Sequence, residues 1–261
     1  MEFYFVLSGL LVGFIIGLSG VGGGSLMTPL LIMGFGLPPA VAVGTDLLYA
    51  GITKASATLF RGRLGSINIK VALILGLGSV PAAILTSIFF ISPAVMNHDV
   101  GVFITRTLGA MLCVTSIALI FRKRLQTLSK TMFRSEGKAQ YSRITIATFI
   151  LGGVLGVLVT LTSVGAGAIG LTALLVLYPH LPANHLAGTD IMHAVPLTLV
   201  AGLSHAVVGS VDFQLLITLL LGSIPGVILG SSVAHKMPET LLQWIIGAIL
   251  FSVGLSLIFQ N

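Results

Sequence analysis

A glycine-rich stretch near the N-terminus separates two apolar runs. Residues 17–25 read Gly-Leu-Ser-Gly-Val-Gly-Gly-Gly-Ser. Glycine allows the backbone to turn and lets a ligand approach closely. A short helix that follows would direct its unpaired N–H groups and the positive end of its dipole at the same space. Residues 162–167, Thr-Ser-Val-Gly-Ala-Gly, repeat this break in the second half of the chain.

Two such breaks, brought together, predict a binding site for a small anion. Backbone N–H groups and hydroxyls would supply its donors. The candidate donors lie at Ser19, Gly22, Gly23, Gly24, Ser25, Thr162, Ser163, Gly165 and Gly167. Tight helix crossing through small residues is the alternative interpretation of the same glycines.

The tripeptide Gly-Thr-Asp occurs twice, at residues 44–46 and 188–190, each time before a long apolar run. An Asp inside a membrane segment is costly and is a functional candidate by default. We expect Asp46 and Asp190 to couple transport to protons, and Thr45 and Thr189 to contribute to substrate binding. The alternative is that each motif caps a helix at the membrane interface.

Two further polar residues fall inside apolar segments. Lys54 follows Asp46 by eight residues, so the two side chains would lie about 80° apart around a helix. We expect Lys54 to face an anionic substrate, although a long lysine can also reach an interface. His193 follows Asp190 by three residues, close enough to interact on a helix, and is a further coupling candidate. No spacing of His, Cys or Glu resembles a metal site, and no cofactor is expected.

Composition places these residues in a membrane. Of 261 residues, 56% are hydrophobic and 8% are charged, whereas soluble domains carry about 25% charged residues. Long apolar runs without strict alternation predict helices rather than a membrane β-barrel. The runs at 25–36 and 166–178 are too short to cross alone, since a spanning helix needs about 20 residues. They predict broken or re-entrant helices beside the glycine-rich breaks.

The chain also contains an internal duplication. A shift of 144 residues places Gly44-Thr45-Asp46 on Gly188-Thr189-Asp190, and Gly78-Ser79-Val80-Pro81 on Gly222-Ser223-Ile224-Pro225. We therefore expect an all-α integral membrane protein, a polytopic bundle of two homologous repeats. Repeat one would occupy residues 1–121, a basic loop 122–143, and repeat two 144–261.

Charge indicates how the repeats are oriented. Seven of the 13 Lys and Arg residues lie in 122–143, which favours a cytoplasmic loop rather than a nucleic-acid site. The loop near 61–70 is basic, but its counterpart in the second half is not. That change predicts inverted repeats, with parallel repeats and weakly biased loops as the alternative. The predicted location is the inner or plasma membrane.

Together these features resemble the sulfite exporter TauE/SafE family of membrane permeases. The resemblance rests on the N-terminal glycine-rich segment, Pro29, the Gly44-Thr45-Asp46 region, the loop containing Gly65, and a second copy of this pattern. It departs in the second half, where Ala166 replaces a glycine and Thr198 stands at the position of Lys54. The resemblance implies a permease for sulfur-containing anions such as sulfite or organosulfonates.

The leading hypothesis is thus a secondary transporter that moves a small anion by alternating access between two repeats. Its partners would be the lipid bilayer, the anion, protons and, as an open question, further copies of the chain. A cation transporter or channel using broken-helix carbonyls with Asp46 and Asp190 is the alternative. An intramembrane serine hydrolase, with Ser19 as nucleophile and His193 or His205 as base, is less favoured because the break is duplicated.

Overall fold

The described part of the chain is helical. The computed structural model describes residues 2–19, 24–61, 67–90, 98–132, 138–233 and 239–259. The first half holds α1 (Glu2–Ser19), α2 (Gly24–Pro29), the π-helical turn η1 (Leu30–Gly34), α3 (Pro39–Arg61), α4 (Ile69–Phe90) and α5 (His98–Met132). The second half holds α6 (Lys138–Thr162), α7 (Ala168–Leu177), α8 (Ala183–Val207), α9 (Phe213–Val233) and α10 (Glu239–Phe259). The predicted all-α class is confirmed.

Six of the described helices are long and apolar enough to cross a membrane: α4, α5, α6, α8, α9 and α10. Their outward faces carry large apolar side chains, such as Leu77, Leu221 and Phe89, each about two-thirds exposed. Such faces suit contact with lipid rather than water. The chain is therefore a multi-pass membrane protein.

The two short apolar runs form short helices, as expected. The run at 25–36 becomes α2 and η1, and ends at Gly36, whose φ of +68° stops the helix. The run at 166–178 becomes α7, which follows an irregular turn after α6. Neither helix is long enough to span a bilayer by itself.

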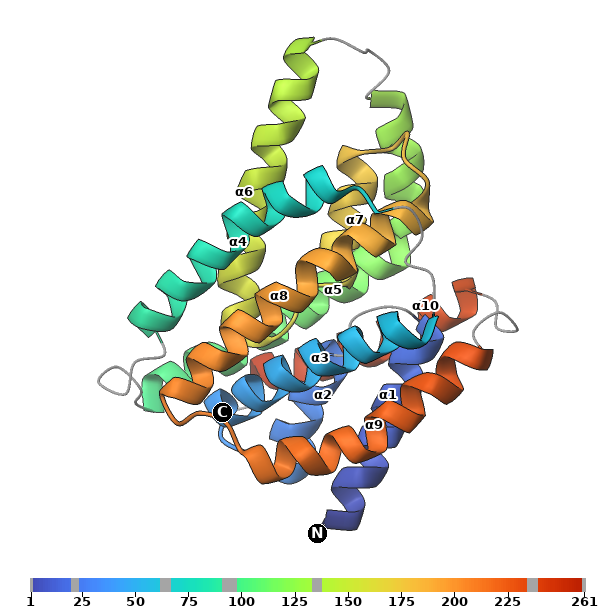
Figure 1. Cartoon of the computed structure of the whole chain (residues 1–261). Helices are drawn as coiled ribbons and strands as arrows, with labels where there is room; N and C mark the ends of the chain where they lie inside the picture. The colour runs from blue at the N-terminus through green and yellow to red at the C-terminus, as the bar shows by residue number, and fades with distance from the viewer. Residues whose placement is uncertain are drawn as a thin grey trace.

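The long central helices α3 and α8 pack against each other and run diagonally through the molecule (Figure 1). The pair α1 and α9 covers one side of them, and the pair α4 and α6 covers the other. The helices α5 and α10 form a further packed pair. A shift of 143 residues places α1 on α6, and the 144-residue shift places α4 on α9, so these contacts are reciprocal between the halves. Whether the repeats are inverted relative to the membrane stays a prediction.

Glycines bring the flanking pairs into backbone contact. A Cβ at Gly9 or Gly13 of α1 would collide with the carbonyl oxygens of Leu219 and Ser223 on α9. On the other side, Cβ atoms at Gly152 and Gly156 of α6 would collide with the carbonyls of Leu75 and Ser79 on α4. These four glycines occupy matching positions, and so do the four residues they meet. Close approach through small residues is the usual way for helices to associate where lipid weakens the hydrophobic drive.

The basic segment 122–143 is largely helical, rather than the loop that its charge predicted. Helix α5 continues to Met132, and α6 begins at Lys138. Both ends project beyond the rest of the bundle (Figure 1). The helix continues past residue 121 because residues 122–132 contain neither Gly nor Pro to stop it. The cytoplasmic location of this segment and the domain boundaries stay predictions.

Gly78→Leu is expected to destabilise the protein, because its side chain would collide with the backbone of Phe149 and Gly153 on α6. Overpacking of this kind costs about 1–3 kcal/mol or more. The measurement is the melting temperature of the purified protein in detergent. Gly76→Leu on the same helix is the matched control, because nothing lies within 4 Å of a Cβ there. Equal melting temperatures for the two variants would contradict the packing described above.

Candidate functional site

The break between α6 and α7 is a sharply turned segment inside the bundle. Ser163, Gly165 and Gly167 have φ values of +59°, +122° and +127°. Ser163 is the only non-glycine residue with positive φ among the described residues, a conformation that bulky side chains rarely adopt. Thr162 steadies the turn, since its Oγ1 donates to the Leu158 carbonyl at 2.7 Å and accepts from the Val164 N–H at 3.2 Å.

Lys54 reaches this break from α3. Its Nζ donates to the carbonyl oxygen of Ala166 at 2.8 Å, although the two residues are 112 positions apart. The lysine is only 7% exposed. Its ammonium also acts electrostatically on Asp46 and on Asp190. The buried amine of Lys54 therefore lies at the glycine-rich break and interacts with both repeated aspartates.

Asp46 ties the short helix α2 to α3. Its Oδ2 accepts hydrogen bonds from the Thr28 backbone N–H at 3.2 Å and from the Thr28 hydroxyl. The carboxyl group is fully buried, and Ser163 lies close enough to act on it. Its Oδ1 has no hydrogen-bond partner among the described residues. Asp46 thus links α2, α3 and the break of the second half.

Asp190 lies against α7 and, like Asp46, interacts electrostatically with Lys54. It is 2% exposed, and its Oδ1 also lacks a hydrogen-bond partner within the described part of the chain. A Cβ on Gly170 of α7 would collide with this oxygen. Gly170 therefore leaves the space that the Asp190 carboxyl group occupies.

The centre holds two carboxyl groups and one ammonium group. If all three ionise, the cluster of Asp46, Lys54 and Asp190 has a net charge of −1. An uncompensated charge in a bundle interior is very costly. Arg122 of α5 also acts electrostatically on Asp190, so either this guanidinium or a proton on one carboxyl group offsets the excess negative charge.

Serine side chains extend the polar centre along α4 and α9. The Ser79 hydroxyl lies 2.8 Å from His193 Nε2. At the matching position of the other half, Ser223 lies 3.2 Å from the Thr53 hydroxyl and acts on Tyr49. Tyr49 corresponds to His193 by the 144-residue shift. The two halves thus present the same serine to different partners.

The family model of the sulfite exporter TauE/SafE proteins matches residues 5–257 of the chain. The chain belongs to this family. It is 38% identical to the probable membrane transporter protein YjnA of Bacillus subtilis (strain 168), with 99% of this chain and 100% of that protein covered. The probable membrane transporter protein YdhB of the same organism is 30% identical, with 95% and 97% covered. A probable membrane transporter protein of Xylella fastidiosa (strain 9a5c) is 22% identical, with 97% and 94% covered.

No solved structure matches the chain significantly. The membership confirms the resemblance that the glycine-rich and Gly-Thr-Asp motifs indicated. It also makes the chain a membrane transporter in its general class, because the relatives above carry that name.

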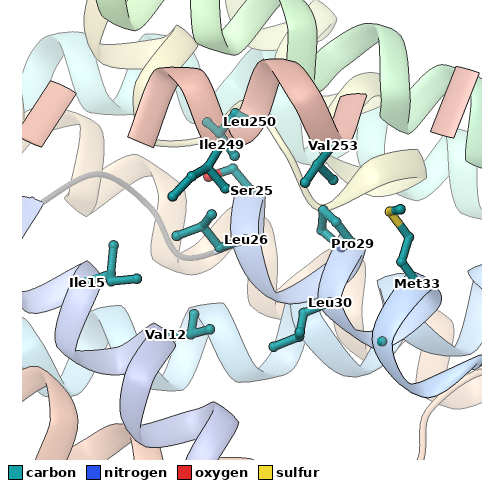
Figure 2. Close-up of a pocket in the computed structure, with 11 residues that line it drawn as sticks. Val12, Ile15, Ser25, Leu26, Pro29, Leu30, Met33, Ile249, Leu250 and Val253 are labelled. Carbon is teal, nitrogen blue, oxygen red and sulfur yellow. The ribbon is translucent and has the colours of Figure 1, made fainter. Parts of the chain in front are cut away.

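The structure brings several predicted site residues of this TauE/SafE protein together. Asp46, Lys54, Asp190, Ser163 and the break carrying Gly165 and Gly167 meet at the centre. Of the first break, Gly22 and Gly23 lie outside the described residues, Ser19 ends α1, and Gly24 begins α2. Ser25 lines a separate apolar cavity between α1, α2 and α10 (Figure 2).

Thr45 and Thr189 have a different environment from the one expected. Thr45 Oγ1 accepts the backbone N–H of Asp212 at 3.0 Å, and Thr189 Oγ1 accepts that of Asn68 at 3.0 Å. Asp212 and Asn68 precede α9 and α4. Their side-chain oxygens accept the backbone N–H groups of Leu215 and Val71 in the first turns of these helices. Each threonine hydroxyl therefore ties one half of the protein to the start of a helix in the other half.

Sequence reasoning missed four residues that shape this centre: Thr28, Tyr49, Ser79 and Gly170. Ser79 carried a signal, because it and Ser223 both stand two residues before a proline in the duplicated segment. Thr28 and Gly170 lie in the short helices, where apolar runs hide the positions that face a partner. Within the described residues, no group of three or more His, Cys, Asp or Glu side chains gathers to hold a metal ion.

Gly170→Ala is expected to displace the Asp190 carboxyl group, because the added methyl group occupies its place. Transport by vesicles carrying the variant should fall several-fold while the amount of folded protein changes little. Gly153→Ala on α6 is the control, since the nearest atom to its Cβ, the Gly78 carbonyl oxygen, is 3.9 Å away. Full transport activity in Gly170→Ala would show that the position of Asp190 does not matter.

Proposed function

We propose that this protein is a secondary transporter for a small sulfur-containing anion such as sulfite or an organosulfonate, and that it works by alternating access between its two halves. One observation carries the proposal. The buried Lys54 ammonium lies at the Gly-rich break of the second half, bonded to the Ala166 carbonyl oxygen. An arriving anion can replace that carbonyl as the partner of the ammonium. Charge-assisted hydrogen bonds of this type are about twice as strong as neutral ones.

Proton coupling follows from the charge of the centre. Asp46 and Asp190 bring two carboxyl groups and Lys54 brings one ammonium group. If both carboxyl groups are ionised, an anion that binds beside them adds to an existing negative charge. Protonation of one or both carboxyl groups removes this repulsion. We therefore propose that protons enter with the anion and that Asp46 and Asp190 carry them, with His193 as a further coupling group.

Transport requires the centre to open to each side in turn. Helices α3 and α8 cross at the centre and carry Asp46, Lys54, Asp190 and His193. Reciprocal contacts between the halves would allow the same motion to open either side. We place the protein in the inner or plasma membrane, with segment 122–143 in the cytoplasm. Association into homo-oligomers is a further proposal.

A cation transporter is the second candidate, favoured by the excess of carboxylate over ammonium. The Oδ1 atoms of Asp46 and Asp190 lack hydrogen-bond partners among the described residues and could serve as cation ligands. Catalysis by a serine hydrolase has less support. The Nε2 atoms of the two histidines considered as bases contact the Ser79 hydroxyl and the Thr160 carbonyl.

Lys54→Gln is expected to abolish anion binding, because the amide carries no charge to compensate the anion. The measurement is the melting temperature of the purified protein with sulfite, thiosulfate, sulfonates, sulfate, acetate and chloride. A ligand that binds the folded state raises this temperature by mass action. The native protein should respond selectively to a sulfur oxyanion.

Lys123→Gln is the control for this experiment, because Lys123 is an exposed residue of α5 that donates a hydrogen bond to Thr240 of α10. It should respond to anions as the native protein does. A shift with sodium but with no anion would replace the anion proposal by the cation candidate.

Asp46→Asn and Asp190→Asn are expected to remove the dependence of transport on a proton gradient, because an amide cannot take up the proton. The measurement is uptake of the anion into proteoliposomes at several imposed pH gradients. Glu2→Gln is the control, since Glu2 bonds Gln214 at the exposed end of α1. An unchanged response in both aspartate variants would remove these residues from proton coupling.

A further inference from the structure

A cavity of about 420 Å³ lies on the far side of α2 from the charged centre. Its walls come from α1, from α2 and η1, and from α10 (Figure 2). Among the described residues of this lining, Ser25 is the only one with a polar side chain, and the others include Leu26, Leu30, Ile249 and Val253. Thr28, which bonds Asp46, is absent from the lining. Helix α2 therefore separates the cavity from Asp46.

The cavity lies where the two halves differ in how closely their short helices pack. In the second half, α7 packs closely along α5, where Ala168 and Ile169 join the apolar core around Leu108 and Leu112. The corresponding helices of the first half, α2 and α10, touch at only a few residues. The short helix of the first half therefore packs less closely on its neighbour than the short helix of the second half does.

Two side chains of the cavity lining are exposed on the surface of the bundle. Ile249 stands at the middle of the membrane-spanning stretch Thr240–Phe259 and is 43% exposed. Met33 on η1, on the opposite wall, is 41% exposed. What reaches these side chains at mid-membrane depth is hydrocarbon.

Water and vacuum are both poor occupants of this space. A bound water needs two to four polar partners, and the lining offers one polar side chain. An empty apolar cavity leaves its walls without the dispersion contacts that packed neighbours would supply. A hydrocarbon chain supplies those contacts and has no polar group to satisfy.

We propose that an acyl chain of a membrane lipid occupies this cavity and packs between α2 and α10. The chain presses α2 toward α3, where Thr28 meets Asp46. This lipid site is separate from the proposed transport site and does not depend on what the protein transports.

The test uses the full-length protein in nanodiscs with a phosphatidylglycerol that carries a photoreactive diazirine in the middle of one acyl chain. After illumination, mass spectrometry identifies the labelled peptides. We expect labelling of α2, η1 and the middle of α10 to exceed labelling around Leu77 and Leu221 several-fold. Those two residues are more exposed but lie outside the cavity lining.

Val253→Phe fills the cavity and should lower the labelling of α2 and η1 several-fold. Ile249→Phe is a second filling variant, in case the first folds poorly. Ile245→Phe is the matched control, since Ile245 is 47% exposed on α10 and lies outside the cavity lining. It should leave the labelling unchanged.

Labelling that is uniform over all lipid-facing helices would overturn the proposal, and so would labelling that both filling variants leave intact. Protection of the cavity only in samples where copies of the chain crosslink through α10 would assign it to an interface between copies instead. None of these outcomes depends on transport, so a failure here leaves the anion proposal unaffected.

Discussion

The burial of the Lys54 ammonium depends on the broken helix that receives it. A continuous helix would use the Ala166 carbonyl in its own hydrogen-bond ladder, and the ammonium would then face apolar side chains. The break frees that carbonyl, and the carboxyl groups of Asp46 and Asp190 balance the charge. The positive φ angles at Ser163, Gly165 and Gly167 therefore form the turn and also leave the Ala166 carbonyl available to the Lys54 ammonium.

The charged centre also holds the short helices in place. Helix α2 has six residues, too few to be stable alone. It gains two hydrogen bonds from Asp46, while α7 fits against Asp190 because Gly170 has no side chain. A change in the charge of either carboxyl group therefore acts directly on a short helix, which provides a physical route from proton binding to movement.

The helices of this protein could be predicted closely, but the environment of its polar residues could not. The two apolar runs too short to span, 25–36 and 166–178, became the short helices α2 with η1 and α7, because burial in lipid leaves little ambiguity in a continuous apolar stretch. The roles of Thr45 and Thr189 depend on contacts with Asp212 and Asn68 in the other half. Such pairings join residues more than 100 positions apart, and no local pattern shows them.

The two halves share contacts but differ at the positions that carry chemistry. The backbone-to-backbone glycine contacts and the two threonine hydrogen bonds are reciprocal, so the frame of the bundle is symmetric. By the 144-residue shift, Lys54 corresponds to Thr198 and Tyr49 corresponds to His193. Helix α7 packs closely on α5, whereas a cavity lies between α2 and α10. A symmetric frame allows two equivalent motions. Because only the first half carries this lysine, the bundle has one lysine-containing site rather than two. The differences therefore lie where a transporter needs one substrate site, and the symmetry lies where it needs two equivalent movements.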